Sequence, residues 1–155
     1  MATETERKFL VKGEFRHLAV RQIAITQSYL SKDPYKTIRL RITDDKAYIT
    51  IKTPLTKETI TRNEWEFQIP LDEATDIIKI CLPGKVSKTR YIVPSGRHNF
   101  EVDVFHDKNE GLVIAEIELE LEDEQFDIPD WLGVEVTGNP DFYKGEFREC
   151  HQRKF

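Results

Sequence analysis

The sequence is short of the residues that build disulfide and zinc frameworks. It has two cysteines, Cys81 and Cys150, and four scattered histidines among 155 residues. Two cysteines without CxxC spacing exclude a disulfide-rich scaffold, and no zinc-binding pattern occurs. Because disulfides are rare in reducing compartments, this cysteine usage favours a cytoplasmic location.

Long apolar runs and glycine-rich phosphate motifs are also missing. No apolar stretch approaches the roughly 20 residues that a transmembrane helix needs. The N-terminus is polar and charged from Thr3 onward, so we expect neither a signal peptide nor a membrane partner. No P-loop, GxGxxG or GxSxG motif is present. The net charge of −5 argues against nucleic acid as a partner, because phosphate backbones attract net-basic chains.

What the sequence does have is charge, at 33% of residues, arranged on alternating positions of short segments. Alternation with a period of two predicts strands, and the charged residues occupy the polar positions. We expect strands over 4–11, around 27–30, and over 37–42, 47–52, 59–69, 85–93, 99–105, 112–122 and 133–137. We expect helices over 13–22 and 73–81, the second capped by Asp72, and a terminal helix that begins after Asn139.

These elements predict one α+β domain over residues 1–155, because no linker and no fixed repeat divides the chain. Eight or nine strands joined by short turns predict a mostly antiparallel sheet. The sheet is either open with one solvated face or closed into a barrel.

The first expected strand shows the charge pattern in its shortest form. Its polar face carries Glu4, Glu6 and Lys8, and side chains two apart on a strand lie roughly 6.8 Å from each other. The other polar faces carry Arg39, Arg41, Arg62, Lys88 and Arg90 on the basic side, and Glu64, Glu66, Glu101, Asp103, Glu116, Glu118 and Glu120 on the acidic side.

Two interpretations of this pattern stay open on physical grounds. Cross-strand pairs of opposite charge are common on the solvated face of an antiparallel sheet, where each contributes little to stability. Like charges two apart on one strand are unfavourable there, however. They are better explained by a bound ligand, with a metal ion between carboxylates and a polyphosphate among guanidinium groups, inside a wide barrel.

With these motifs the chain resembles the CYTH superfamily, the triphosphate tunnel metalloenzymes. The family's motifs correspond here, in order, to Glu4-x-Glu6-x-Lys8, Arg39-x-Arg41, Lys52, Arg62-x-Glu64-x-Glu66, Lys88-x-Arg90, Glu101-x-Asp103, Glu116-x-Glu118-x-Glu120 and Glu135-Val136-Thr137-Gly138. The last motif departs from the family's D-V-T-G at its first residue. Each motif is weak alone, but their order extends over nearly the whole chain.

The resemblance implies a closed eight-stranded antiparallel β-barrel with a few flanking helices, whose bore binds a triphosphate and a divalent metal. It also implies hydrolysis of a phosphoanhydride bond in inorganic tripolyphosphate or a related organic triphosphate. Two other functions remain open. An adenylate cyclase on the same fold would use the same metals and phosphate contacts, and a non-catalytic polyphosphate- or nucleotide-binding module would need only the basic residues. A homodimer is compatible with the sequence.

The resemblance assigns roles to individual residues. The metal ligands for Mg²⁺ or Mn²⁺, two ions per site, are Glu4, Glu6, Asp103, Glu116, Glu118 and Glu120. The phosphate-binding residues are Lys8, Arg39, Arg41, Lys52, Arg62, Lys88 and Arg90. The catalytic residues are Lys8, Lys52 and Glu118, together with Tyr29, which is added because it shares a strand face with Gln27 and can orient the substrate or a water. For two of them a structural role is the alternative: Arg62 as partner of Glu64 or Glu66, and Tyr29 as an aromatic residue of the barrel wall.

Overall fold

A computed structural model describes residues 2–55 and 60–142 of the chain. The strands are β1 (Ala2–Val11), β2 (Arg21–Asp33), β3 (Lys36–Ile42), β4 (Ala47–Pro54), β5 (Thr61–Ile69), β6 (Val86–Ser95), β7 (His98–Phe105), β8 (Val113–Leu119) and β9 (Leu132–Glu135). The helices are one α-helix, α1 (Leu71–Ile77), and the 3₁₀ turns η1 (Arg16–Leu18), η2 (Ile78–Ile80), η3 (Asp107–Asn109) and η4 (Pro140–Phe142).

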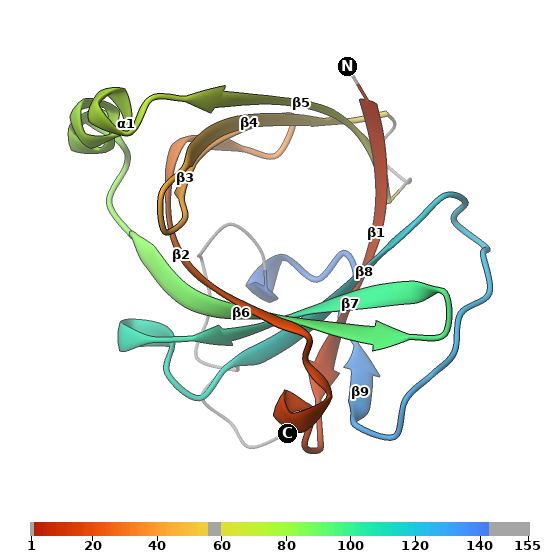
Figure 1. Cartoon of the computed structure of the whole chain (residues 1–155). Helices are drawn as coiled ribbons and strands as arrows, with labels where there is room; N and C mark the ends of the chain where they lie inside the picture. The colour runs from red at the N-terminus through yellow and green to blue at the C-terminus, as the bar shows by residue number, and fades with distance from the viewer. Residues whose placement is uncertain (1, 56–59, 143–155) are drawn as a thin grey trace.

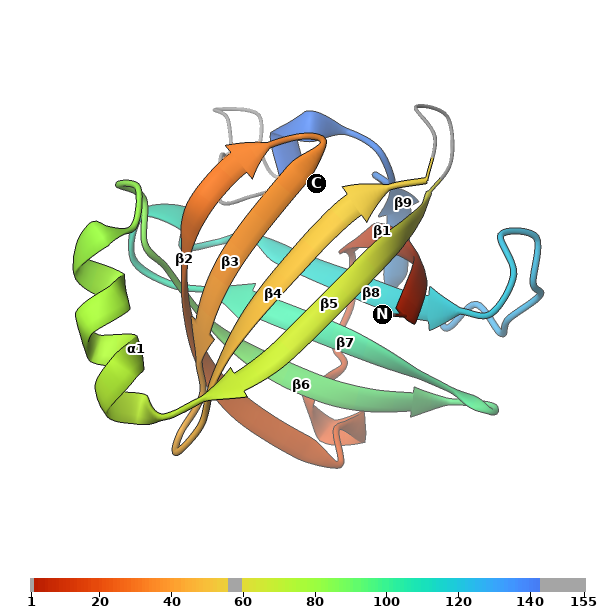
Figure 2. The same cartoon turned by 90° about the horizontal axis from the view of Figure 1, so that it is seen from above.

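The sheet closes into a ring of eight antiparallel strands. Its order is β5-β4-β3-β2-β6-β7-β8-β1, and β1 pairs back onto β5 from Ala2↔Glu64 to Thr5↔Thr61. The ninth strand, β9, pairs with the later part of β1 outside this ring. Figure 1 looks along the axis, and Figure 2 shows the tilt of the strands. The closed antiparallel ring confirms the predicted fold class.

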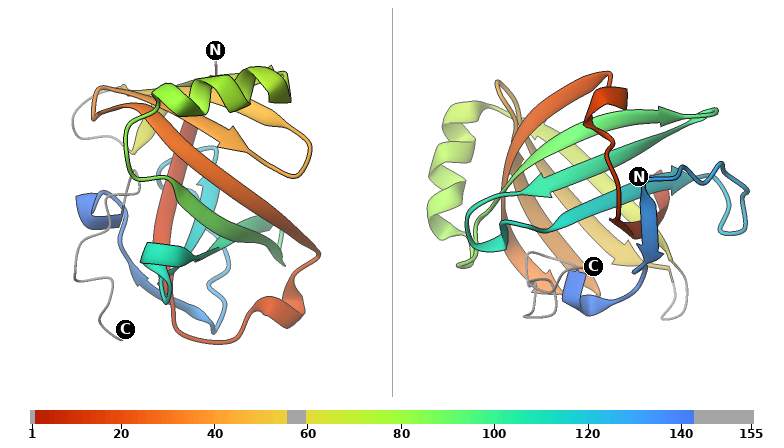
Figure 3. Two further views of the ribbon diagram at one scale, coloured as in Figure 1. Left: turned by 90° about the vertical axis from the view of Figure 1, so that its left-hand side faces the viewer. Right: turned by 90° about the horizontal axis from the view of Figure 1, so that it is seen from below.

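Alternation along each strand separates an apolar outer face from a charged bore. The main outer core gathers around Phe9, Phe100, Ile117 and Trp131 on the β1, β6, β7 and β8 side of the ring. A smaller cluster lies beneath α1, which covers the outer face of β3 and β4 (Figure 3). Because these two cores lie outside the ring, most of the bore is lined by polar side chains.

The predicted helix over 13–22 is wrong. Only η1 is helical there, and β2 already begins at Arg21. Phe15 is buried against Tyr91 and Trp131, whereas Leu18 is largely exposed, so the two do not form one apolar stripe. The backbone N–H of Val20 donates to the carbonyl of Ile92 on β6, so pairing with β6 replaces a helix.

The other helices and strand ends differ from the prediction in smaller ways. The second helix divides into α1 and η2, and its cap is Pro70, whereas Asp72 lies in the first turn. Ala74, Ile77, Ile78 and Cys81 pack on the β3–β4 face as their spacing predicted. The terminal helix shows one turn, η4, and its continuation from 143 lies outside the described residues, as does residue 59 of the fifth expected strand. Within the described ranges, no helix has the length and apolar character needed to cross a membrane.

Candidate active site

The bore encloses a cavity of about 240 Å³ that is lined mainly by charged side chains. Seven are carboxylates and seven are cationic. The carboxylates are Glu4, Glu6, Glu64, Glu66, Glu101, Glu116 and Glu118, and the cations are Lys8, Arg39, Arg41, Lys52, Arg62, Lys88 and Arg90. Charges of both signs in one enclosed space suit an anionic ligand that arrives with its own cations.

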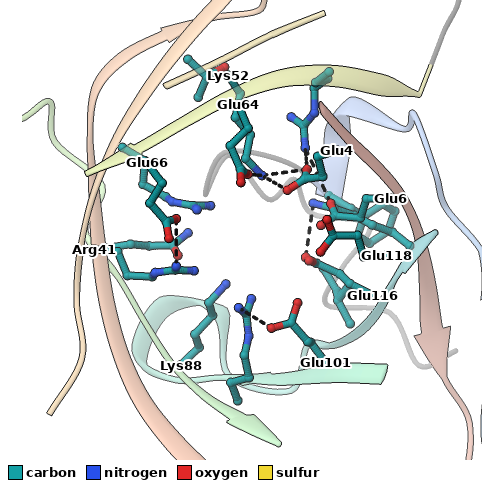
Figure 4. Close-up of a pocket in the computed structure, with 18 of the residues that line it drawn as sticks. Glu4, Glu6, Arg41, Lys52, Glu64, Glu66, Lys88, Glu101, Glu116 and Glu118 are labelled. Atoms are coloured by element: carbon teal, nitrogen blue, oxygen red, sulfur yellow. Dashed lines mark hydrogen bonds and ion pairs between the residues drawn. The ribbon is translucent and has the colours of Figure 1, made fainter. Parts of the chain in front are cut away.

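The structure brings most of the predicted site residues together, because they occupy alternate strand positions whose side chains point into the ring. All of them line the cavity except Asp103 and Glu120. Figure 4 shows Glu6, Glu116 and Glu118 on one wall, with Arg41 and Lys88 across the cavity from them. The solvated-face interpretation is therefore wrong for these residues, since their polar face is the inside of the closed ring.

The acidic wall is built by the pairing of β1 with β8, which sets Glu6 opposite Glu118 and Lys8 opposite Glu116. Lys8 Nζ lies 3.6 Å from Glu116 Oε1. The Glu4 carboxylate accepts hydrogen bonds from Lys52 at 2.9 Å and from Arg62 at 3.0 Å. Burial alone would raise the pKa of Glu4, but Lys52, a hydrogen bond with Glu64, and Arg62 together lower it to about 2.

Arg62 contacts Glu4 and Glu6 in this wall, whereas the structural alternative named Glu64 or Glu66. Its Nη2 lies 3.0 Å from Glu4 Oε1 and 3.7 Å from Glu6 Oε1. The alternative to a phosphate role proposed Glu64 or Glu66 as partners, but both of these follow Arg62 on β5. Pairing of β1 with β5, which sets Glu4 opposite Arg62, explains the contact, and sequence alone does not supply that register.

Glu118 is distinctive because it makes no ion pair with any described residue. Burial, followed by the negative charges of Glu4 and Glu6, raises the pKa of its carboxyl group. A cation bound between these carboxylates would offset that repulsion, and carboxylate oxygen is the donor that Mg²⁺ and Mn²⁺ prefer. The donor set therefore fits a divalent metal. In the described part of the chain, however, no three acidic, His or Cys side chains converge in an ion-holding arrangement. Lysine and arginine partners occupy several of the carboxylate oxygens instead.

The basic wall lies on β3 and β6. Arg41 donates to Glu66 at 3.3 Å, and Thr50 donates to the same carboxylate oxygen at 3.0 Å. Arg39, two residues before Arg41 on β3, makes no ion pair with a described residue. Burial, then the neighbouring charges of Arg39 and Arg90, lowers the pKa of Arg41, so these guanidinium groups repel each other. Such crowding is relieved when a polyanion lies among them.

Asp103 is fully buried behind the bore and serves the basic wall. Its carboxylate accepts two hydrogen bonds from Arg90, at 2.8 and 2.9 Å, and lies 2.7 Å from Lys88 Nζ. Burial would raise the pKa of Asp103, but Arg90 and Lys88 outweigh it and lower the pKa. Asp103 does not line the cavity, and its oxygens are bonded to these two cations instead of facing a metal site.

Glu120 also falls outside the cavity. The strand predicted over 112–122 ends at Leu119, so the alternation that would have turned Glu120 inward stops there. Beyond this point the backbone N–H groups of Glu120 and Leu121 donate to the Glu124 carboxylate in place of a neighbouring strand. Glu120 is exposed and lines a shallow groove beside Thr3 and Thr5.

Tyr29 lines the cavity from β2 and is almost completely buried. It lies opposite Arg39 in the sheet, with Lys32 Nζ 5.8 Å from its ring centre. Both of its predicted roles, substrate contact and wall residue, are compatible with this position.

Several cavity residues received no role from the sequence. Glu64, Glu66 and Glu101 occupy strand positions whose side chains point into the bore, and this alternation could have selected them. Gln27 and Thr37 occupy such positions too, but they are uncharged. Phe142 has no such signal, because it comes from η4 and not from a strand. It joins Leu10, Phe105 and Ile114 in an apolar cluster that makes one end of the cavity lining hydrophobic.

The family profile of the CYTH domain matches residues 2–146, nearly the entire chain. The chain belongs to the CYTH family. Among curated proteins, an "Inorganic triphosphatase" from Acetivibrio thermocellus is 41% identical over 141 residues, which are 90% of this chain and 89% of that protein.

Solved structures show the same CYTH fold. The inorganic triphosphatase NE1496, known from a crystal structure, shares 29% sequence identity with this chain. The two structures superpose with a TM-score of 0.62, and the match covers 94% of each chain. The Hippeastrum protein HpAC1 is described as a putative adenylyl cyclase with a dominant triphosphatase activity. It reaches the same TM-score at 11% identity, over 76% of this chain and 80% of its own. At that identity the likeness shows the fold alone.

Proposed function

We propose that this CYTH protein is a metal-dependent hydrolase that cleaves a phosphoanhydride bond of inorganic tripolyphosphate. The observation that carries the proposal is the division of the bore into an acidic wall on β1 and β8 and a basic wall on β3 and β6. A binding module would need only the basic wall. The similarity to the inorganic triphosphatase from Acetivibrio thermocellus supports the same activity.

The metal would be Mg²⁺ or Mn²⁺, with two ions per site, held by Glu4, Glu6, Glu116 and Glu118. When bound, these ions supply charge neutralisation on phosphate oxygens and a more acidic water. Glu118 is the strongest ligand candidate, because its carboxylate has no cationic partner among the described residues. Asp103 and Glu120 are not in this set, because Asp103 is bonded to Arg90 and Lys88 and Glu120 lies outside the cavity.

The side chains of the chain itself position the substrate. Arg39 and Arg41, opposite the carboxylates, would hold phosphoryl oxygens through charge-assisted hydrogen bonds. Lys88 and Arg90 would do the same from β6, and Arg62 would contribute a further cation. Phosphoryl transfer depends mostly on such positioning and on stabilisation of charge.

Three residues would act closer to the bond that breaks. Lys8 and Lys52 lie beside Glu116 and Glu4, where their ammonium groups can stabilise charge developing on the departing phosphate. The hydroxyl of Tyr29 can donate to a phosphoryl oxygen or orient a water molecule. A cytoplasmic location completes the proposal, because the two cysteines without CxxC spacing suit a reducing compartment.

Tripolyphosphate should be a better substrate than ATP. A nucleoside needs a stacking aromatic ring and polar groups that read the base, within a pocket that is usually about 300 Å³ or more. The cavity is smaller, at about 240 Å³, and Tyr48 lies outside its lining with Arg41 5.7 Å from its ring centre. We expect kcat/KM for tripolyphosphate to exceed that for ATP at least about tenfold, or about 1.4 kcal/mol.

The measurement compares tripolyphosphate, ATP and thiamine triphosphate under one metal condition, with Mg²⁺ and then Mn²⁺. Phosphate, pyrophosphate and cyclic AMP are quantified separately. Phosphate and pyrophosphate in equal amounts from tripolyphosphate support the proposal. Cyclic AMP as the main product of ATP would instead establish the adenylate cyclase alternative, and tight binding without turnover of any substrate would establish the binding module.

Lys88 makes substrate binding depend on pH. Burial lowers the pKa of its ammonium group to about 8, although Asp103 acts in the opposite direction. Above pH 8 the free protein loses this cation, so binding of tripolyphosphate should weaken between pH 8 and 9.5. Stability should respond with the opposite sign. Between pH 8 and 10.5 the unfolded chain holds a proton that the folded chain has released, so the contribution of Lys88 to the free energy of unfolding rises.

Calorimetric titration of the metal-free protein with tripolyphosphate at pH 7, 8 and 9.5 measures this effect. The variant Lys88→Met is the reference, because it removes the titrating group and leaves the ionisation of the ligand unchanged. It should bind more weakly than the wild type at pH 7 and show a smaller loss of affinity with rising pH. An identical pH profile in both proteins would show that Lys88 does not contribute its charge to binding.

A further inference from the structure

Gln27 is a neutral residue among the charges of the bore, and nothing in the roles assigned so far accounts for it. It lies on β2 and lines the cavity, but the residue is only 5% exposed. Its amide oxygen Oε1 is buried and has no hydrogen-bond partner in the described part of the chain. A buried amide oxygen without a partner is unfavourable in the free protein, so a ligand that donates a hydrogen bond to it would recover that loss.

The neighbours of Gln27 indicate the chemistry of that ligand. Pairing of β2 with β3 sets Gln27 directly opposite Arg41 and Tyr29 opposite Arg39. The Nε atoms of both arginines are likewise buried without a hydrogen-bond partner in the described residues. Opposite residues of an antiparallel pair have Cα atoms about 4.5–5.5 Å apart, so the three unpaired groups lie on one small area of wall.

A phosphoryl group that carries one hydroxyl pairs with all three atoms. Its unprotonated oxygens accept hydrogen bonds from the two Nε–H groups, and its hydroxyl donates to Gln27 Oε1. A metal ion would not be attracted here, because Arg39 and Arg41 repel it. A hydrocarbon would leave all three polar atoms unpaired.

We propose that Gln27 contacts the substrate, with its amide hydrogen-bonded to the phosphoryl group that Arg39 and Arg41 hold. Gln27 is thus a substrate-binding residue on the wall opposite the carboxylates, and it adds a hydrogen bond there without adding charge. This inference rests on the proposed function, because that function supplies the phosphoryl ligand.

The test measures binding of tripolyphosphate to the metal-free protein by calorimetry, where no turnover occurs. Gln27→Met keeps the length of the side chain and removes its hydrogen-bonding groups. It should weaken binding about tenfold, which corresponds to about 1.4 kcal/mol. Gln27→Glu should weaken binding further, because a carboxylate at this position repels phosphate. The melting temperature of unliganded Gln27→Met should be equal to or above that of the wild type, since an unpaired buried amide oxygen has been removed.

Gln22→Met is the matched control, because it makes the same substitution at an exposed position of the same strand. It should bind as the wild type does. Should Gln27→Met fold poorly, Gln27→Asn retains an amide but withdraws it from the cavity, and the same loss of affinity is expected.

Unchanged affinity in Gln27→Met, with a wild type that binds and hydrolyses tripolyphosphate, would overturn the role of Gln27 alone. A lower melting temperature with unchanged affinity would also overturn it, since Gln27 would then be a packing residue. A wild type that neither binds nor hydrolyses tripolyphosphate would overturn the proposed function together with this inference.

Discussion

Replacing Glu118 with glutamine should lower tripolyphosphate hydrolysis about 10²–10³-fold, the loss typical when one group that stabilises a transition state electrostatically is removed. The amide keeps the shape of the side chain and removes the charge. Glu118 is the wall carboxylate without a cationic partner in the described residues, so no ion pair of the free protein is broken. Loss of activity would therefore report on the bound metal and not on a disrupted wall.

The same substitution should stabilise the metal-free protein at neutral pH. Burial and the charges of Glu4 and Glu6 raise the folded-state pKa of Glu118 above its unfolded value. A group of this kind favours folding while it is protonated, and the contribution is lost as pH rises through the folded pKa. Glu118→Gln should thus melt at a higher temperature than the wild type at pH 8, with a smaller difference at pH 4.

Glu120→Gln is the control for Glu118→Gln, because Glu120 is exposed and lies just beyond the end of β8. Its kcat and its dependence on metal concentration should equal those of the wild type. The metal assignment fails if Glu118→Gln retains near-normal turnover, or if the wild type is fully active in excess EDTA. Equal losses of activity in Glu118→Gln and Glu120→Gln would show that Glu120 is a metal ligand.

Strand alternation predicted which side chains share a face, whereas the closed ring was implied by the resemblance to the CYTH superfamily. A period of two places Arg39 with Arg41, and Lys88 with Arg90, on the same side of any strand, whatever its partners are. Once the sheet is closed, that side is the bore. Twelve of the proposed site residues line the cavity, and alternation alone placed them on that side without knowledge of distances.

What alternation cannot supply is where a strand ends and which strand lies beside it. Glu120 has the inward phase of Glu118, but β8 stops at Leu119, where loop residue Glu124 takes over the backbone N–H groups. The helix expected over 13–22 failed for a related reason, since pairing of Val20 with β6 outweighs a weak helical pattern. Both errors come from contacts between residues distant in sequence.

The metal-ligand role predicted for Asp103 does not fit its position. Strand alternation predicts to which side of the sheet a side chain points, but not how deeply it is buried. Asp103 points to the same side of β7 as Glu101, yet it is fully buried, whereas Glu101 reaches the cavity. Pairing of β7 with β6 sets Asp103 directly opposite Arg90, whose guanidinium group binds both of its oxygens. A carboxylate with its oxygens committed to Arg90 and Lys88 orients two phosphate-binding cations instead of holding a metal.

Asp103→Asn should consequently affect stability and substrate affinity but not the metal requirement. Removing one partner of a buried ion pair typically destabilises a protein by about 3–5 kcal/mol, because the other charges remain buried without compensation. Arg90 keeps its hydrogen bond to Glu101 at 3.0 Å, so it should turn toward that side and away from its position in the free enzyme. We expect KM for tripolyphosphate to rise about tenfold or more, since a charge-assisted contact is weakened.

Kinetics at several metal concentrations separate this role from a metal-binding role. The metal concentration that gives half-maximal activity should be the same in Asp103→Asn and the wild type, whereas Glu118→Gln should shift it or abolish activity. Asp45→Asn, an exposed change in the β3–β4 turn, controls for the substitution itself and should leave KM and melting temperature unchanged. If Asp103→Asn instead required much more metal at unchanged KM, Asp103 would be a metal ligand after all, and its pairing with Arg90 would belong only to the metal-free state.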